Sequence, residues 1–165
     1  MNSGERQLLN LLFLCTGNSA RSIMAEAITN KIGSEKIQAF SAGSRPVGVV
    51  HPLAVQLLGK LNYSTSSLKS KSWTEFAAPN AEELDLVITV CDNARAEECP
   101  VWPGNPALGH WSIPDPAQLN SDFAAFKSAY DLLTTLIQAL VDLPLAGMSA
   151  AELKKHLNGI TTHID

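Results

Sequence analysis

The sequence has no excess of basic residues. It carries 12 Lys and Arg against 16 Asp and Glu, which gives a formal net charge of -4 and a pI of about 5.5. The overall field of such a chain does not attract nucleic acid or an anionic membrane surface. We therefore expect neither as a partner, and any anion that the protein binds must be held by a local arrangement of donors.

Long hydrophobic runs are also missing. The apolar stretch at residues 8–14 is about seven residues long, is interrupted by Asn10 and follows polar and charged residues. It is too short for a membrane span and has the wrong flanks for an export signal. We expect it to form a buried strand, and we expect the protein to be cytoplasmic.

Cysteine is scarce. The chain has three, Cys15, Cys91 and Cys99, an odd number that is too small for a framework of disulfides. In a cytosolic chain they are expected to be free, catalytic or redox-active thiols. What the sequence does have is 165 residues of which 45% are hydrophobic, enough for one domain over residues 1–165 with a proper core.

Apolar periodicity and turn residues predict strands that alternate with helices. Such alternation is typical of an α/β protein, here a three-layer α/β/α fold with a central four-stranded parallel sheet. A polar loop rich in Pro and Gly is expected at residues 92–107. The strands are expected at residues 8–14, 37–41, 84–90 and 109–113, and the helices at 20–32, 52–58, 73–77, 123–140 and from 149 to about 159.

Three reactive side chains follow predicted strands. Cys15 ends the first strand, Cys91 ends a later one and Asp115 follows the last. In an open parallel sheet the ligand lies at the carboxyl ends of the strands, where the strand order reverses. We therefore expect these three residues at one edge of the sheet.

The loop after Cys15 has the composition of an anion-binding turn. Small and turn-forming residues separate the strand from the helix, so their backbone N–H groups can form a nest at the positive helix end. These donors would lower the pKa of Cys15 and favour its thiolate. Arg21 offers a planar fork for two oxygens, and Ser22 a hydrogen bond to the thiolate. The residues expected around the oxyanion are Thr16, Gly17, Asn18, Ser19, Ala20, Arg21 and Ser22.

Each of these features has a plainer interpretation when taken alone. A Cys with an Arg six positions later is common by chance, and an Asp between prolines is usually a turn residue. Cys91 would serve equally as a small buried apolar residue, with Cys99 as a spectator. A zinc site from these two cysteines and His110 is also open, although the spacing is unlike the usual ligand pairs.

The combined motifs resemble a known family. The segment 13–22, followed by Met24-Ala25-Glu26, is similar to the phosphate-binding loop of the low-molecular-weight tyrosine phosphatases, and more similar still to the arsenate reductases that share their fold. The resemblance reaches to about residue 140 through Ser41-Ala42-Gly43, residues 87–91, Cys99-Pro100, His110-Trp111 and Asp115-Pro116-Ala117.

The resemblance implies a role for each reactive residue. Cys15 would be the nucleophile, Arg21 the oxyanion clamp and Asp115 the general acid. In the reduction of arsenate to arsenite, Cys91 would then attack Cys15, and Cys99 would attack Cys91. The resulting disulfide would be reduced by thioredoxin or by glutathione with glutaredoxin. We expect no cofactor and no metal.

The sequence departs from the family pattern at several positions. Ala20 stands where the phosphatases and many reductases have a further cysteine, and seven residues separate Cys91 from Cys99. Some relatives bind potassium through residues that match Asn18, Glu26 and Ser41, with an aspartate near the place of Lys71. We expect the ammonium of Lys71 to replace that ion here.

Two other functions stay open at this point. The first is a low-molecular-weight tyrosine phosphatase that hydrolyses phosphomonoesters, although Pro116-Ala117-Gln118 stands where those enzymes carry tyrosines. The second is a module that binds an oxyanion or phosphopeptide without catalysis, which the joint presence of Cys15, Arg21 and Asp115 argues against.

Overall fold

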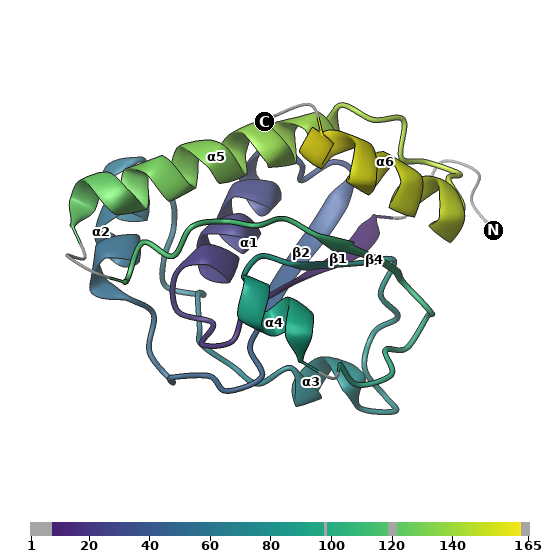
Figure 1. Ribbon diagram of the computed structural model, residues 1–165, viewed down its shortest axis with the longest axis horizontal. Coiled ribbons are helices and arrows are strands. Elements are labelled where there is room, and N and C mark those ends of the chain that lie inside the picture. The colour runs from purple at the N-terminus through teal and green to yellow at the C-terminus, as the bar shows by residue number, and fades with distance from the viewer. Residues whose placement is uncertain (1–7, 98, 119–121, 163–165) are drawn as a thin grey trace.

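The computed structural model describes residues 8–97, 99–118 and 122–162 (Figure 1). Its strands are β1 (Leu9–Leu14), β2 (Ile37–Ala42), β3 (Leu86–Thr89) and β4 (Ala107–His110). Its helices are α1 (Arg21–Ile32), α2 (Pro52–Lys60), α3 (Thr74–Ala77), α4 (Asp92–Ala96), α5 (Phe123–Val141) and α6 (Ala150–Thr162).

The four strands form one sheet in the order β2-β1-β3-β4, and all three neighbouring pairs are parallel. The predicted four-stranded parallel sheet is confirmed. Because β1 pairs with β2 on one side and β3 on the other, the strand order reverses between β1 and β3. Chain segments that leave these two strands therefore diverge around a crevice at their carboxyl ends.

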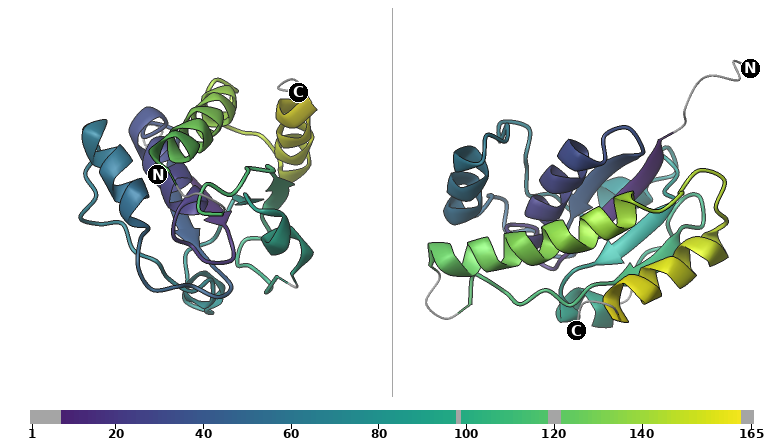
Figure 2. Two further views of the ribbon diagram at one scale, coloured as in Figure 1. Left: turned by 60° about the vertical axis from the view of Figure 1, so that its left-hand side comes forward. Right: turned by 90° about the horizontal axis from the view of Figure 1, so that it is seen from above.

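Successive side chains of β1 point to opposite faces of the sheet, and the two faces carry hydrophobic clusters of unequal size. Leu11 and Phe13 belong to the larger cluster, with residues of α1, α2, α5 and α6. Leu12 and Leu14 point to the opposite face, where Trp102 and the partly buried Phe76 of α3 cover them. Figure 2 shows the longer helices gathered on one side of the sheet. The protein is thus a three-layer α/β/α structure, with one thick and one thin outer layer.

Several predicted boundaries are wrong. A short helix, α4, lies inside the predicted loop 92–107, because the sulfur of Cys91 accepts a hydrogen bond from the Ala94 N–H at 3.4 Å and caps its first turn. The strand expected at 84–90 is shorter in the structure, where β3 covers Leu86–Thr89. The strand expected at 109–113 begins earlier, because Ala107 pairs with Leu86 in the register with β3.

Helix α6 also continues past its predicted end near Gly159. Glycine disfavours a helix interior by roughly 1 kcal/mol. Ile160, the residue after Gly159, is buried in the larger core together with Leu153 and Leu157. This packing outweighs the low helix propensity of glycine. The close approach of α6 to β4 depends on Gly109, since a Cβ there would lie 2.9 Å from a methyl carbon of Leu157.

Ser149 and Glu152 cap the start of α6. Ser149 Oγ accepts a hydrogen bond from the Glu152 N–H at 3.2 Å, and the same hydroxyl donates to the Glu152 carboxylate. Within the described part of the chain, no helix is both long and apolar enough to cross a membrane.

Candidate active site

Asn18 gives the loop after Cys15 its shape. It has a positive φ of 46° and no exposed surface. Its side-chain amide donates to Ser22 Oγ at 2.8 Å, and its carbonyl oxygen accepts the Lys71 N–H at 2.8 Å. Gly43 lies so close to the loop that a Cβ there would be 2.4 Å from the carbonyl oxygen of Thr16. Asn18 therefore shapes the loop.

Residues 45–51 turn the carbonyl groups of the loop outward. The carbonyl oxygens of Thr16, Gly17 and Ser19 accept backbone N–H groups from residues 45, 47 and 51 at 3.0, 3.1 and 2.9 Å. Across a planar trans peptide, C=O and the following N–H point in opposite directions. The amides of residues 17, 18 and 20 are therefore directed away from that segment, which is the arrangement that an anion-binding nest requires.

Cys15 and Cys91 are both buried, and their thiols share a hydrogen bond. The sulfur of Cys91 also accepts the N–H groups of Thr16 and Ala94, each at 3.4 Å. The bond from Cys15, followed by these amides, lowers the pKa of Cys91 to about 5 despite its burial. The two thiols that the sequence placed at one sheet edge therefore interact with each other.

For Cys15 the direction of the pKa shift is opposite to the one expected from the loop alone. The hydrogen bond that it donates to Cys91, and then its burial, raise the pKa of Cys15. Arg21 and the Gly17 N–H lower it, but by less. In this structure the pKa shift of Cys15 is therefore opposite in direction to the expected one, because Cys91 and burial oppose the effect of Arg21.

Arg21 joins the loop to the segment that carries Asp115. Its Nη1 donates to the carbonyl oxygen of Ile113 at 2.9 Å, and its Nη2 lies 3.6 Å from Asp115 Oδ2. The other oxygen of Asp115 accepts the Ala117 N–H at 2.9 Å, which fixes the direction of the carboxylate. Ser22 is fully buried and accepts from Asn18, and no hydrogen bond joins it to Cys15 among the described residues.

Cys99 stands apart from the other thiols. It is exposed, and within the described ranges it makes no hydrogen bond to Cys15 or Cys91. Partial desolvation and the charge of Glu97 raise its pKa. The structure therefore brings together Cys15, Arg21, Cys91 and Asp115, and leaves the fifth predicted residue at the surface.

Two acidic residues of the site were not predicted, Asp92 and Glu97. Glu97 Oε1 accepts a hydrogen bond from Thr16 Oγ1 at 2.8 Å. Asp92 Oδ1 contacts His110 Nε2 at 3.0 Å, and His110 Nδ1 contacts Thr89 Oγ1 at 2.6 Å. The alanines and opposite charges of residues 92–96 are a weak signal for α4, but no local pattern indicates contacts between residues so far apart in the sequence.

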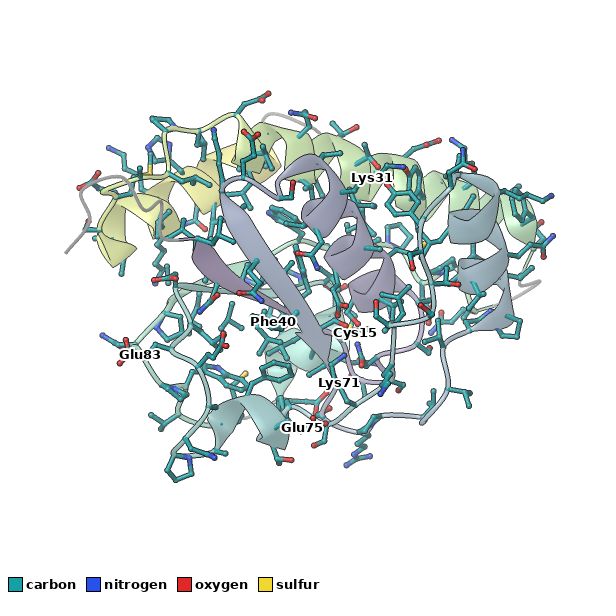
Figure 3. The ribbon with its side chains drawn as sticks, turned by 180° about the vertical axis from the view of Figure 1, so that it is seen from behind. Cys15, Lys31, Phe40, Lys71, Glu75 and Glu83 are labelled. Atoms are coloured by element: carbon teal, nitrogen blue, oxygen red, sulfur yellow. The ribbon has the colours of Figure 1, made fainter. Side chains whose placement is uncertain are left out.

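A partly buried carboxylate lies behind the loop. Glu26 Oε1 accepts from Ser41 Oγ at 2.6 Å and lies 3.7 Å from the ammonium nitrogen of Lys71. Burial raises the pKa of Glu26, while Ser41 and Lys71 oppose that rise. Figure 3 shows Lys71 and Cys15 at the same end of β2. No group of three or more His, Cys, Asp or Glu in the described ranges is arranged to hold a metal ion.

The fold and this loop place the chain in a defined class. The family model of the low molecular weight phosphotyrosine protein phosphatases matches residues 10–158, and the chain belongs to this family. Within this family, the proteins and solved structures that resemble the chain include several named as arsenate reductases.

Two curated relatives illustrate this. The arsenate reductase of Halalkalibacterium halodurans is 37% identical over 136 residues, which cover 80% of this chain and 94% of that protein. Arsenate reductase 2 of Staphylococcus haemolyticus is 32% identical over 133 residues, which cover 78% and 93%.

Two solved structures agree with the sequence relatives. Arsenate reductase from Archaeoglobus fulgidus is similar at 27% identity with a TM-score of 0.65, over 81% of this chain and 99% of that one. An arsenate reductase in a phosphate-binding state has 25% identity and a TM-score of 0.68, over 81% and 97%.

Proposed function

We propose that the protein reduces arsenate to arsenite and so serves arsenic detoxification. The observation that carries this proposal is the position of Cys91 beside the Cys15 loop, where its sulfur accepts the Thr16 N–H at 3.4 Å and its thiol interacts with that of Cys15. Hydrolysis of a cysteinyl phosphate needs water and no second thiol, whereas reduction needs a thiol within reach of the first. The names of the relatives support the same reaction.

In the first step arsenate occupies the inward-facing amides of the loop and the fork of Arg21. The proton of Cys15 passes to an arsenate oxygen, and the sulfur attacks arsenic. One arsenic–oxygen bond breaks, and the departing oxygen takes a further proton from Asp115 and leaves as water. A cysteine-bound As(V) remains on Cys15.

In the second step Cys91 acts as the thiolate. Its sulfur accepts the N–H groups of Thr16 and Ala94, and these donors favour the ionised form of Cys91 after Cys15 has bound arsenic. It attacks the sulfur of Cys15, a disulfide forms and the sulfur–arsenic bond breaks. The electron pair of that bond stays on arsenic, which leaves as arsenite, As(III).

The third step regenerates Cys15. Cys99 attacks Cys91, which releases the thiolate of Cys15 and leaves a disulfide between Cys91 and Cys99. An external dithiol system, thioredoxin or glutathione with glutaredoxin, reduces this disulfide. Since Cys99 is exposed and has no bond to Cys91 in this structure, the step requires movement of the chain after α4.

Phosphatase activity is the second candidate. It is favoured by the family match and by the nearness of Asp115 to Arg21, which suit hydrolysis equally well. Against it, Pro116-Ala117-Gln118 offers no aromatic ring to grip a phenyl phosphate. A non-catalytic oxyanion-binding module would need neither Asp115 nor the contact between the two thiols.

Arsenite formation with each reductant tests the proposal. Wild type is expected to form arsenite, and Cys15→Ser and Cys91→Ser to form none. Asp115→Asn should slow the reaction by about 10²–10⁴-fold, the usual contribution of a general acid. Asp122→Asn is the matched control, because Asp122 caps α5 and Asn caps a helix as well.

The alternatives give different results in the same assay. No arsenite from wild type, with phosphatase activity fully retained in Cys91→Ser, would establish the phosphatase. Full activity of Cys99→Ser with glutathione would replace the third thiol by an external one, while leaving the roles of Cys15 and Cys91 in place.

A further inference from the structure

One serine hydroxyl joins the oxyanion loop to the flanking turn at residues 45–51. Ser70 Oγ donates to the carbonyl oxygen of Gly17 at 3.2 Å and accepts the Gly48 N–H at 3.1 Å. Ser70 is half-buried, and it lies 53 positions from Gly17 and 22 from Gly48 in the sequence. Three separate parts of the chain therefore meet at this hydroxyl.

The bond to Gly17 acts on an amide of the loop. The carbonyl oxygen of Gly17 accepts two donors, the Val47 N–H at 3.1 Å and the hydroxyl of Ser70. Because a trans peptide is planar, a carbonyl group held outward directs the N–H of the next residue, Asn18, to the opposite side. That N–H is one of the donors that the loop offers to an oxyanion, so Ser70 fixes the direction of a binding group.

The bond from Gly48 holds the flanking turn. Gly48 has a φ of 89°, which the turn requires and which favours glycine. The side chains of Val47 and Val49 in this turn are 61% and 67% exposed, so apolar packing does little to fix its position. The turn therefore depends on its hydrogen bonds, among them the one to Ser70.

The neighbours of Ser70 make different contacts. The backbone N–H of Lys71 supports the side chain of Asn18, while the ammonium of Lys71 lies beside a carboxylate of α1. The hydroxyl of Ser72 contacts the start of α3. Among the side chains of residues 68–72, all of which the structure describes, only that of Ser70 bonds to a backbone group of the loop.

We propose that Ser70 is a positioning residue of the oxyanion loop. Its hydroxyl holds the peptide between Gly17 and Asn18 with the N–H directed into the loop, and through Gly48 it keeps the flanking turn in place behind that peptide. The inference rests on the proposed function, in which the bound oxyanion is arsenate. Inorganic phosphate has the same tetrahedral shape and reports on the loop without the redox steps.

Phosphate protection of Cys15 against iodoacetamide tests the inference on the reduced full-length chain, with the alkylated cysteine identified by mass spectrometry. Ser70→Ala should raise the phosphate concentration for half-protection by about threefold to tenfold, the effect of one net hydrogen bond. Binding should weaken without being lost, because the Val47 N–H still holds the Gly17 carbonyl group. Ser70→Thr, which keeps the hydroxyl, should be protected as wild type is.

Ser72→Ala is the matched control, because it removes a hydroxyl from the same segment and leaves the bonds of the loop in place. Its half-protection concentration should equal that of wild type. In the arsenite assay, Ser70→Ala should raise the KM for arsenate and leave kcat unchanged, since the Asn18 amide already acts in the bound ground state. A general loss of structure would instead lower kcat, because fewer molecules are active, and would leave the affinity for phosphate unchanged.

Equal half-protection concentrations in Ser70→Ala and Ser72→Ala would overturn the inference. A loss in Ser70→Thr as large as in Ser70→Ala, or failure of phosphate to protect Cys15 in wild type, would do the same. Should Ser70→Thr fail to fold, the two alanine variants decide. The failure of the proposed function is a separate result, because wild type would then form no arsenite while phosphate still distinguishes Ser70→Ala from Ser72→Ala.

Discussion

At the scale of single residues, Cys91 differs from an inert buried cysteine by the donors that reach its sulfur. A buried thiol without such partners has a raised pKa and low reactivity. Here one thiol and two backbone amides donate to Cys91, and its pKa falls to about 5. These surroundings thus favour the ionised form of Cys91, which the second step of the proposed reaction needs.

Cys91→Ser is expected to make Cys15 more reactive, although it abolishes arsenite formation. The bond to Cys91 is the largest cause that raises the pKa of Cys15, and a serine hydroxyl is neutral. Arg21 and the Gly17 N–H would then act with less opposition, so the pKa of Cys15 should fall. Alkylation of Cys15 at about pH 6 should rise by roughly tenfold, equivalent to one pKa unit.

Cys99→Ser is the control for that measurement, because it removes a thiol without touching the pair. In the same experiment with wild type, the pH profile of Cys91 alkylation should have its midpoint near the pKa of about 5. A slower reaction of Cys15 in Cys91→Ser than in Cys99→Ser would contradict the shared proton.

At the scale of elements, α4 is a helix that its surroundings hold together. At five residues it is far below the length at which a helix is stable alone. Its start is capped by Cys91, its first residue is bonded to His110 and Ser112, and its end is bonded to Thr16. A helix held mainly at its ends can open without disturbing the sheet, as the third step of the proposed reaction requires.

Asp92→Asn should loosen α4 selectively. The bonds from His110 and Ser112 lower the pKa of Asp92, so the contact is fully present above the usual carboxyl range and is lost as pH falls through the folded pKa. Since the side chain is exposed, the effect is small. Hydrogen exchange of the Ala94 and Arg95 amides at neutral pH should speed up by about twofold to fivefold.

The control is Asp131→Asn, which removes an exposed carboxylate of α5 that pairs with Lys127. It should leave exchange in α4 unchanged. Equal protection of α4 in both variants and in wild type would show that the bond to His110 does not hold the helix.

At the scale of the whole molecule, the site is where separate parts of the chain meet. The loop follows β1, its shape depends on Lys71, and Glu26 of α1 is enclosed between Ser41 of β2 and the same lysine. The ammonium of Lys71 therefore neutralises a carboxylate next to the proposed oxyanion loop. A change at this lysine should affect the stability of the molecule as well as the loop.

Lys71→Met should destabilise the protein by about 1–3 kcal/mol, the cost of a buried carboxylate without its partner. Lys71 opposes the raised pKa of Glu26, so its loss raises that pKa further. A raised pKa means that stability is present while Glu26 is protonated and is lost as pH rises through the folded pKa. The difference from wild type in urea unfolding should therefore grow with pH above the usual carboxyl range.

Lys69→Met is the control, since Lys69 is exposed and only its backbone carbonyl oxygen contacts Lys71. It should unfold as wild type at every pH.

Wild type should also have the same melting temperature in KCl and NaCl at equal ionic strength, because the ammonium of Lys71 already neutralises Glu26. Clear stabilisation by potassium would contradict the assigned role of Lys71.

The sequence alone determined the framework of the site. The apolar run before Cys15, the turn residues after it and the amphipathic spacing of the next helix are local patterns. Local patterns fix element type, and parallel sheets place their strand ends at one edge, so Cys15, Cys91 and Asp115 were expected together.

Tertiary structure decided the protonation of the pair, the existence of α4 and the contact of Glu97 with the loop. The pKa of a thiol depends on how many donors reach it and how deeply it is buried, and the Thr16 N–H that reaches Cys91 lies 75 positions away in the sequence. Glu97 and Thr16 are 81 positions apart. Composition and periodicity describe neighbours along the chain, whereas the charge of a site is set by neighbours in space.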